Sequence, residues 1–182
     1  MIVREVEDGD LVARARQGHV DAYNLLVSRW EKRVYNYLLR LVMNREDALD
    51  LTQETFLKAY QNLAKLEEAS RFAPWLFRIA HNEAFSLLRK PKLEDGEPRD
   101  AAPRPSGPRL LPIETSLAVR AALERLSEDQ REAVMLKVYQ GFKFEEIAEI
   151  TDSPVSTIKS RVYTALELLK ETLAPARMRG KA

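Results

Sequence analysis

The sequence GFKFEEIAEITDSPVSTIKSRVYTALELL, Gly141–Leu169, has the pattern of two short amphipathic helices joined by a tight turn. In its first half, Phe144 and Ile147 stand three positions apart and share one face of a helix. The dipeptide Ser153–Pro154 is typical of a helix start, because the serine hydroxyl can cap free backbone N–H groups and proline suits the first helical position. The spacing therefore predicts a helix, a turn and a second helix that begins at Pro154.

The second of these helices has an apolar back and a polar, basic front. The apolar positions keep helical spacing: Val155, Ile158, Val162, Leu166 and Leu169. The residues left to face outward are Ser156, Thr157, Lys159, Ser160, Arg161, Tyr163 and Thr164. In a helix-turn-helix the second helix lies in the major groove of DNA, with short polar groups near its N-terminus and cations that reach phosphates. The pattern predicts a DNA-reading helix, and the alternative is a helix pair with a solvated charged face.

The net charge of the chain changes sign within this stretch. Residues 114–152 hold nine acidic and five basic side chains, whereas residues 153–182 hold six basic and two acidic ones. Such a step is expected if only the last helix and the tail approach a polyanion. The whole chain has a formal net charge of +1, so its long-range attraction to DNA is weak compared with that of a strongly basic protein.

The composition argues against several classes of protein. The chain has no cysteine, and its two histidines, His19 and His81, are far apart, so we expect neither a metal site nor a cofactor. Neither histidine has an evident nucleophile in its motif, which argues against an enzyme. No apolar run is long enough to cross a bilayer, and the N-terminus MIVREVEDGD lacks the apolar core of a signal peptide. We expect a cytoplasmic protein without membrane insertion.

A proline-rich segment divides the chain. Residues 91–112, PKLEDGEPRDAAPRPSGPRLLP, hold six prolines and two glycines and show little apolar periodicity, which predicts an extended, flexible linker. It separates two modules, residues 1–90 and 113–182, each near the lower size limit for folding alone.

Both modules are predicted to be helical. In the first, helices are expected near Asp10–Gln17, Val20–Val42, Arg45–Leu63 and Ser70–Arg89. In the second, one helix covers Ile113–Arg125 and another runs from Ser127 to about Gly141, before the helix-turn-helix. Asn44 with Asp47 resembles a helix cap, Ser70 is a candidate cap, and Ser127 with Gln130 forms a capping-box pattern. The sequence therefore predicts an all-α protein with two small helical domains.

The helix expected over residues 45–63 carries two stripes. The first is a narrow core stripe of Ala48, Leu51, Thr55, Ala59 and Leu63. The second consists of Asp50, Gln53, Glu54, Leu57 and Gln61. A large aliphatic residue, Leu57, thus stands in the middle of an otherwise polar face, which predicts a docking surface. The alternative is that Leu57 widens the core stripe and that Asp50 and Glu54 are merely solvated.

The next helical segment interleaves aromatic and basic residues. These are Phe72, Trp75, Phe77 and Phe85 with Arg71, Arg78, Arg89 and Lys90. Such a mixture suits unpaired nucleic acid, because bases stack on rings and phosphates pair with cations. The alternative is that at least half of the aromatic residues belong to the core. Arg78 and Asn82, four positions apart, are the better candidates for contact.

Taken in order, four features resemble an extracytoplasmic-function (ECF) sigma factor over almost the whole chain. They are DALDLTQETFLKAY at 47–60, FAPWLFRIAHN at 72–82, the linker, and LSEDQREAVMLKVYQGFKFEEIAEI…SPVSTIKSRV at 126–162. The resemblance implies a non-catalytic bacterial initiation subunit that binds core RNA polymerase through its largest subunits and directs it to promoter DNA. It also implies control by an anti-sigma factor. The alternatives are a stand-alone helix-turn-helix regulator and a helical adaptor with no role on nucleic acid.

The resemblance also assigns roles to residues. A docking face for core polymerase consists of Asp50, Gln53, Glu54 and Leu57. The minus-ten contacts, where the family captures an unstacked base, are Ser70, Arg71, Trp75, Arg78 and Asn82. The minus-35 contacts are Ser156, Thr157, Lys159, Ser160, Arg161 and Tyr163, with Lys159 and Arg161 as the leading cations. Residues 1–90 correspond to region 2 of the family and residues 113–182 to region 4.

Two positions depart from the family pattern. The segment Leu66–Ser70 reads LEEAS where many relatives carry an aromatic-Arg-Gly-Asp run, and Glu67 and Glu68 would repel phosphate unless they point away or meet a cation. In the turn of the helix-turn-helix, Asp152 occupies a place where glycine is common. Aspartate tolerates left-handed backbone angles better than most residues, so the fold is expected to be kept.

Overall fold

The structure is a computed structural model that describes residues 6–90 and 113–173, with residues 113–116 described by their backbone alone. All regular structure within these ranges is helical, as expected for an all-α protein. The chain divides into two compact units, one made mainly of residues before the proline-rich segment and the other mainly of residues after it. The segment expected to be a linker, 91–112, lies outside the described residues, and so does the tail from 174.

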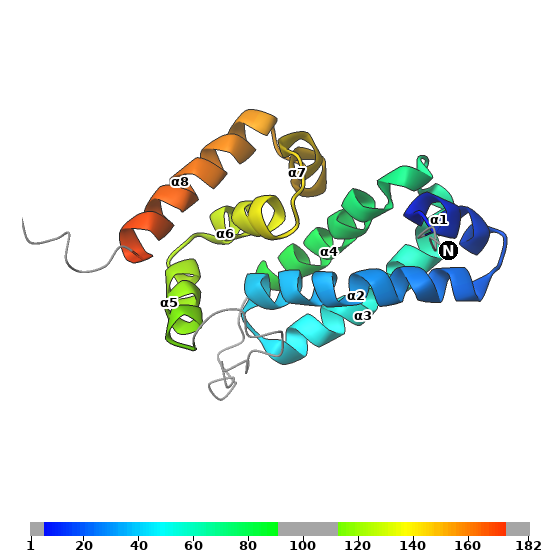
Figure 1. The fold of residues 1–182 in the computed structure, drawn as a ribbon, viewed down its shortest axis with the longest axis horizontal. Helices are drawn as coiled ribbons and strands as arrows, with labels where there is room; N and C mark the ends of the chain where they lie inside the picture. The colour runs from blue at the N-terminus through cyan, green and yellow to red at the C-terminus, as the bar shows by residue number, and fades with distance from the viewer. Residues whose placement is uncertain (1–5, 91–112, 174–182) are drawn as a thin grey trace, which may run out of the picture. The chain divides into compact units, whose positions relative to one another are not determined.

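The first unit contains four helices, coloured blue to green in Figure 1. They are α1 (Asp8–Arg16), α2 (Val20–Val42), α3 (Arg45–Asn62) and α4 (Phe72–Leu88). Two 3-10 turns, Leu63–Lys65 and Ala69–Arg71, connect α3 to α4. The predicted bounds of α2 are confirmed, whereas α1 begins two residues earlier than expected.

The start of α4 differs from the prediction. Ser70 was expected to cap this helix, but it lies inside the second 3-10 turn, and α4 begins at Phe72. The residue in the cap position, Arg71, makes no side-chain capping bond. The 3-10 turn packs against α1, a tertiary contact that overrides the local preference of serine for a cap position.

The residues that join α2 to α3 adopt the helix-ending and helix-capping conformations that the local sequence favours. Met43 ends α2 in the left-handed conformation, with φ of +58°, and its N–H donates to the Leu39 carbonyl at 2.9 Å. The predicted cap at Asn44 is confirmed, because its Oδ1 accepts a hydrogen bond from the Asp47 N–H at 3.0 Å.

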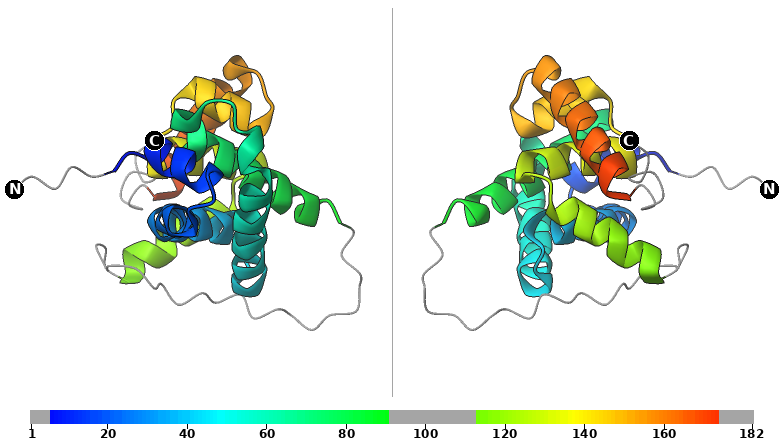
Figure 2. Two further views of the ribbon diagram at one scale, coloured as in Figure 1. Left: turned by 90° about the vertical axis from the view of Figure 1, so that its right-hand side faces the viewer. Right: turned by 90° about the vertical axis from the view of Figure 1, so that its left-hand side faces the viewer.

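Aromatic rings fill the core of the first unit. Phe77 of α4 is fully buried and packs edge to face on Trp30 and Tyr37 of α2, with ring centroids 6.2 and 5.3 Å away. The Tyr23 hydroxyl donates to the Phe56 carbonyl and so ties α2 to α3, and burial raises the pKa of this phenol above its usual value. In the left view of Figure 2, α2 is seen almost along its axis and α3 runs across it.

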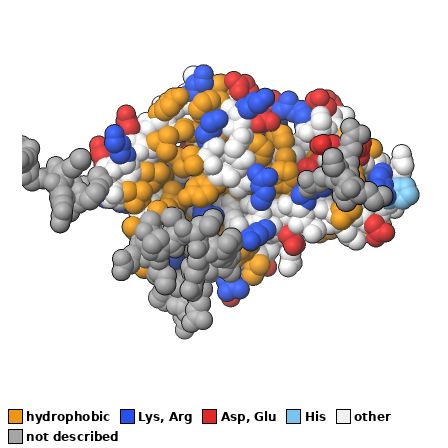
Figure 3. All heavy atoms as spheres, in the orientation of Figure 1, with side chains coloured by type: hydrophobic (Ala, Val, Ile, Leu, Met, Phe, Trp, Pro, Cys, Tyr) orange, Lys and Arg blue, Asp and Glu red, His pale blue; other side chains and the backbone are white. Residues whose placement is uncertain are grey.

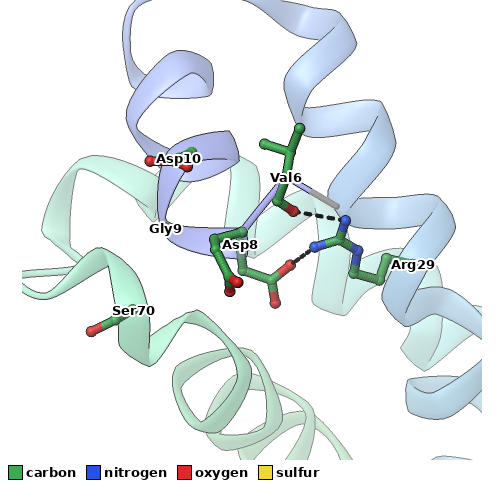
Figure 4. Close-up of a pocket in the computed structure, with 7 residues that line it drawn as sticks. Val6, Asp8, Gly9, Asp10, Arg29 and Ser70 are labelled. Atoms are coloured by element: carbon green, nitrogen blue, oxygen red, sulfur yellow. Dashed lines mark hydrogen bonds and ion pairs between the residues drawn. The ribbon is translucent and has the colours of Figure 1, made fainter. Parts of the chain in front are cut away.

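A network of polar contacts fixes α1 to α2 (Figure 4). The Asp8 carboxylate accepts hydrogen bonds from Arg29 and, at 2.9 Å, from the Trp30 indole N–H. Arg29 also donates to the Val6 carbonyl at 3.0 Å. An open pocket of about 520 Å³ lies beside this network, lined by Val6, Glu7, Asp8, Gly9, Asp10, Arg29 and Ser70.

The second unit contains α5 to α8, coloured yellow-green to red in Figure 1. They are α5 (Ile113–Glu124), α6 (Glu128–Val134), α7 (Phe144–Thr151) and α8 (Val155–Leu173). The helix expected from Ser127 to about Gly141 is therefore shorter, because Met135–Tyr139 form a π-helical turn at its end. Helix α8 begins at Val155, one residue after the expected start at Pro154, and ends at Leu173.

The start of α6 is held from both sides. The predicted capping box is confirmed: Ser127 Oγ accepts from the Gln130 N–H, and Gln130 Oε1 accepts from the Ser127 N–H, both at 3.2 Å. One turn further on, the buried guanidinium of Arg131 donates to the carbonyls of Leu123 and Leu126 at 3.0 and 3.2 Å. Burial lowers the pKa of Arg131, and these two carbonyls, one in the last turn of α5 and one just after it, accept hydrogen bonds from its guanidinium.

Helix α8 buries Ile158, Val162 and Ala165 and packs mainly on α6 and α5. These residues recur at helical spacing, so one side of α8 is committed to the core of the unit and the other side stays at the surface. Among the described helices of both units, none is long and apolar enough to span a membrane.

Candidate functional site

The polar stripe of α3 lies at the surface of the first unit. Leu57 is 51% exposed, Asp50 and Gln53 are exposed, and Glu54 is half-buried. The core stripe of the same helix is buried on the opposite side, for example at Thr55. The alternative in which Leu57 widens the core is therefore wrong. Leu57 is an exposed aliphatic side chain with polar neighbours, and its role in docking stays a prediction.

A salt bridge fixes one border of this docking face. Lys58 Nζ lies 2.6 Å from Glu83 Oε1 on α4 and 3.6 Å from Glu54 Oε1 on its own helix. The hydrogen bond to Glu83 is the main cause of the raised pKa of Lys58. Lys58 thus joins α3 to α4 beside the docking face, mainly through Glu83.

One side of α4 gathers three of the residues predicted to contact the minus-ten element. Trp75, Arg78 and Asn82 fall at i, i+3 and i+7 and therefore share a face. Arg71 and Ser70 precede the helix, in the 3-10 turn. Arg78 and Asn82 are exposed, and Arg71 and Trp75 are partly exposed. With Arg71, the face combines two cations, an aromatic ring and an amide, the groups that bind phosphates and unstacked bases.

The other aromatic residues of α4 have structural positions. Phe72, Phe77 and Phe85 are buried, which confirms that at least half of the aromatic residues in this segment belong to the core. The Trp75 ring lies 6.0 Å from the ring of Phe72, so the buried ring supports the partly exposed one. The ring of His81 packs on Phe85 at 4.5 Å between centroids.

The segment before α4 is anchored at one end and exposed in its middle. Leu66 is buried, whereas Glu67, Glu68 and Ser70 are exposed. Ser70 borders the pocket beside α1, and its hydroxyl points away from Asp8 (Figure 4). The two carboxylates are thus at the surface next to the α4 face, where they oppose a phosphate but can accept hydrogen bonds from a base edge.

The turn between α7 and α8 has the expected backbone. Asp152 adopts φ of +49°, in the left-handed region, as predicted for this position. The Ser153 N–H donates to the Ala148 carbonyl at 3.0 Å, and the Ile158 N–H donates to the Pro154 carbonyl at 3.1 Å. The turn therefore closes α7 and opens α8 within a few residues, as a helix-turn-helix requires.

The outer side of α8 presents most of the residues predicted to read the minus-35 element. Ser156, Lys159, Ser160 and Tyr163 are exposed, and Thr157 is partly exposed. Near them, the ring of Phe144 lies 5.7 Å from Lys159 Nζ and 6.3 Å from the Tyr163 ring.

Lys137 is a cation that the sequence analysis did not single out. Its Nζ lies 4.5 Å from the Phe144 ring centroid and donates to the Phe142 carbonyl at 3.2 Å. Lys137 belongs to the π-helical turn, and Phe144 begins α7, so no periodicity along one helix could reveal their contact. Phe144 was assigned to an apolar face, and the structure adds that its ring lies near two lysines.

Arg161 differs from the other residues predicted to contact the minus-35 element. Its side chain is only 25% exposed, and Nη2 lies 2.8 Å from Asp129 Oδ2 of α6. Its Nη1 donates to Ser153 Oγ at 3.3 Å. The guanidinium therefore has protein partners already. Sequence periodicity could not show this, because Asp129 lies 32 residues away along the chain.

On the face drawn in Figure 3, lysine and arginine side chains are interspersed with acidic and hydrophobic ones. In the ranges 6–90 and 113–173, no three histidine, aspartate or glutamate side chains are grouped so that they could hold a metal ion.

Comparisons with known proteins match both units. Residues 26–93 match the family model described as Sigma-70 region 2, and residues 116–169 match the one described as Sigma-70, region 4. The ECF RNA polymerase sigma-E factor of Haemophilus influenzae is 36% identical, over 96% of this chain and 99% of the relative. The RNA polymerase sigma-H factor of Pseudomonas aeruginosa is 32% identical, over 96% of this chain and 97% of the relative.

Two solved structures have the same fold over most of the chain. The sigma factor RpoE of Bartonella quintana, in complex with the anti-sigma factor NepR, is 30% identical with a TM-score of 0.74, covering 85% of this chain and 98% of that one. CnrH, in complex with the cytosolic domain of CnrY, is 26% identical with a TM-score of 0.71, covering 91% of this chain and 96% of that one.

Proposed function

The chain belongs to the ECF family of RNA polymerase sigma factors, and on this premise we propose how its two units share the recognition of a promoter. As a sigma factor it directs core RNA polymerase to specific promoters and aids strand opening at the start of transcription. Similarity to sigma factors along nearly the whole chain supports this function over that of a stand-alone helix-turn-helix regulator.

Residues 1–90 form the domain that binds core polymerase, through the docking face of Asp50, Gln53, Glu54 and Leu57. The observation that carries this proposal is the exposure of Leu57 in the middle of a polar face. Burying a leucine side chain on a partner stabilises a complex by about 1.5–3 kcal/mol. Protein interfaces commonly surround such a central apolar contact with a polar rim.

The same domain binds the minus-ten element through Ser70, Arg71, Trp75, Arg78 and Asn82. The partly exposed Trp75 ring offers a stacking surface, and the guanidinium groups on its two sides suit the flanking phosphates. Such contacts offset the few kcal/mol that unstacking and unpairing a base costs, so strand opening needs no separate energy source.

Residues 113–182 form the domain that binds the minus-35 element, with α8 in the major groove. Its exposed residues Ser156, Thr157, Lys159, Ser160 and Tyr163 offer hydroxyl groups for base edges and a cation for phosphate. Arg161 belongs to the same helix but reaches its flank, where Asp129 binds it.

Residues 91–112 link the two domains. A chain of roughly 20 residues spans several tens of ångströms when extended, so it can connect two sites on a large partner. Holding both DNA contacts on one polymerase raises their effective concentration. We further propose a cytoplasmic location beside the polymerase, and control by an anti-sigma factor, as in the complex of RpoE with NepR.

Reconstituted transcription tests this function. The chain is added to core polymerase and genomic DNA fragments, and the run-off transcripts are sequenced. We expect new transcripts whose start sites share two upstream elements, one near minus ten and one near minus 35. Transcripts that do not change on addition of the chain would contradict the proposal.

A further inference from the structure

The contacts of Arg161 suggest a role other than a direct contact with DNA. Its guanidinium joins three segments of the second unit: α8, which carries it, the turn before α8 through Ser153, and the first turn of α6 through Asp129. Each bond has ordinary length, 3.3 Å to Ser153 Oγ and 2.8 Å to Asp129 Oδ2. A side chain bound in this way is a brace between elements.

The helical positions of the two cations of α8, Lys159 and Arg161, also indicate different roles. Successive residues of an α-helix are rotated by about 100°, so Lys159 and Arg161 project about 160° apart. The buried residues Ile158 and Val162 fix which side of the helix faces the core. Arg161 therefore lies on one flank of the exposed side, where it meets Asp129, and Lys159 lies on the other flank.

The acidic partner lies in the first turn of α6. Asp129 stands between Ser127 and Gln130, the two residues of the capping box that starts this helix. A carboxylate in the first turn of a helix is stabilised by the partial positive charge of the free N–H groups there. Because α6 also packs along α8, the pair of Asp129 with Arg161 joins two helices that are already in contact.

We infer that Arg161 is a positioning residue: through Asp129 and Ser153 it sets the orientation of α8 in the major groove and does not itself neutralise a phosphate. This inference rests on the proposed function of α8. Removing Arg161 or Asp129 then shifts the helix and misplaces Ser156, Ser160 and Tyr163 against the bases. Removing Lys159 instead removes a phosphate contact.

Salt dependence separates the two roles. The full chain is assembled with core polymerase, and its affinity for promoter duplexes with an intact or a scrambled minus-35 element is measured over a series of salt concentrations. Each phosphate-bound cation contributes about 0.9 to the slope of log affinity against log salt. Lys159→Gln is therefore expected to lower the slope by about one.

Arg161→Gln and Asp129→Asn are expected to leave the slope unchanged. Both should lower the preference for the intact minus-35 element by about tenfold, the loss expected when one or two base contacts are misplaced. The double variant should lose no more than either single one, because the two residues act as one unit. Arg161→Lys, which keeps a charge for Asp129, should regain part of the preference.

Arg120→Gln is the matched control. Arg120 lies on α5, pairs with Glu124 at 3.1 Å and is 28% exposed, close to the value for Arg161. It should change neither the slope nor the preference. Thermal unfolding of each variant shows whether the second unit remains folded at the assay temperature.

Three results would overturn the inference. The first is a slope that Arg161→Gln lowers as much as Lys159→Gln does, since that result identifies Arg161 as a phosphate contact. The second is tighter DNA binding by Asp129→Asn, since that result identifies Arg161 as a cation that Asp129 withholds from DNA. A fall in melting temperature with unchanged preference identifies a purely structural pair. If the wild-type complex ignores the minus-35 element and Lys159→Gln changes nothing, the proposed function fails, and the inference falls with it.

Discussion

The solvent exposure of Leu57 and Arg161 is the reverse of what is usual for an aliphatic and a charged side chain. The leucine is exposed in the middle of a polar face, and the arginine, predicted as a leading DNA contact, is largely covered and paired with Asp129. An exposed aliphatic residue gains stability when a partner buries it, whereas a paired cation has less to gain from a new partner. Partner binding therefore changes the surroundings of Leu57 far more than those of Arg161.

Leu57→Arg is expected to weaken binding to core polymerase by tenfold or more. The change places a charge where the proposed interface buries an apolar side chain, and burying a leucine side chain stabilises a complex by about 1.5–3 kcal/mol. The affinity is measured by titrating the labelled chain with core polymerase.

Leu25→Arg is the control for this variant. Leu25 lies on α2 and is 54% exposed, similar to Leu57, but it is outside the docking face. It should bind polymerase normally. Circular dichroism should show full helical content for both variants, and a large loss of helix signal in Leu57→Arg would mean that Leu57 supports the fold.

Single residues were predicted unevenly from the sequence. The left-handed backbone of Asp152 followed from the turn pattern, because the conformation depends on neighbouring residues only. The exposure of Leu57 did not follow, since both the core and the docking interpretation fit the same helical spacing. The ion pair of Arg161 depends on how α6 packs on α8, which a periodicity along one helix does not contain.

At the scale of elements, helix starts set by a local side chain were predicted best. The capping bonds at Asn44 and Ser127 form as the sequence indicates. The start of α4 was missed because a 3-10 turn packed against α1 replaces the expected cap at Ser70. The π-helical turn after α6 was missed as well, since its apolar spacing continues that of an ordinary helix.

Ser127→Ala is expected to destabilise the second unit by about 1 kcal/mol. The change removes the hydroxyl that accepts the Gln130 N–H and leaves a free donor at the start of α6. The free energy of unfolding is measured by denaturant titration of the full chain.

Ser86→Ala serves as the comparison, because Ser86 is an exposed residue within α4 and caps no helix. Its free energy of unfolding should change by less than about 0.5 kcal/mol. Equal stabilities of the Ser127→Ala variant and the wild-type chain would show that the capping box does not stabilise α6.

At the scale of the whole molecule, the fold class and the order of the helices were predicted correctly. They depend on apolar periodicity over long segments, which is the strongest signal in a single sequence. The distribution of charge was also informative, because a net charge of +1 limits how strongly the free chain attracts DNA. Under the proposed function, the chain depends on polymerase to bring its two DNA contacts together.

The free chain is therefore expected to bind a promoter duplex at least 100-fold more weakly than its complex with core polymerase. Linking two modest contacts raises affinity by about 10²–10⁴ when geometry allows both to form. A gel-shift assay at physiological salt compares the free chain with the complex on the same duplex. Tight binding by the free chain, unchanged by polymerase, would instead indicate a stand-alone regulator.

The carboxylate partner of Arg161 also bears on how promoters are recognised in a cell that loses water. Osmotic shrinkage concentrates potassium ions, and protein–DNA complexes weaken with every counterion that their formation releases. A guanidinium that is neutralised by Asp129 within its own domain releases none. Under the positioning role inferred for Arg161, its contribution to promoter choice therefore involves no release of counterions during dehydration, unlike a phosphate contact made by an exposed cation.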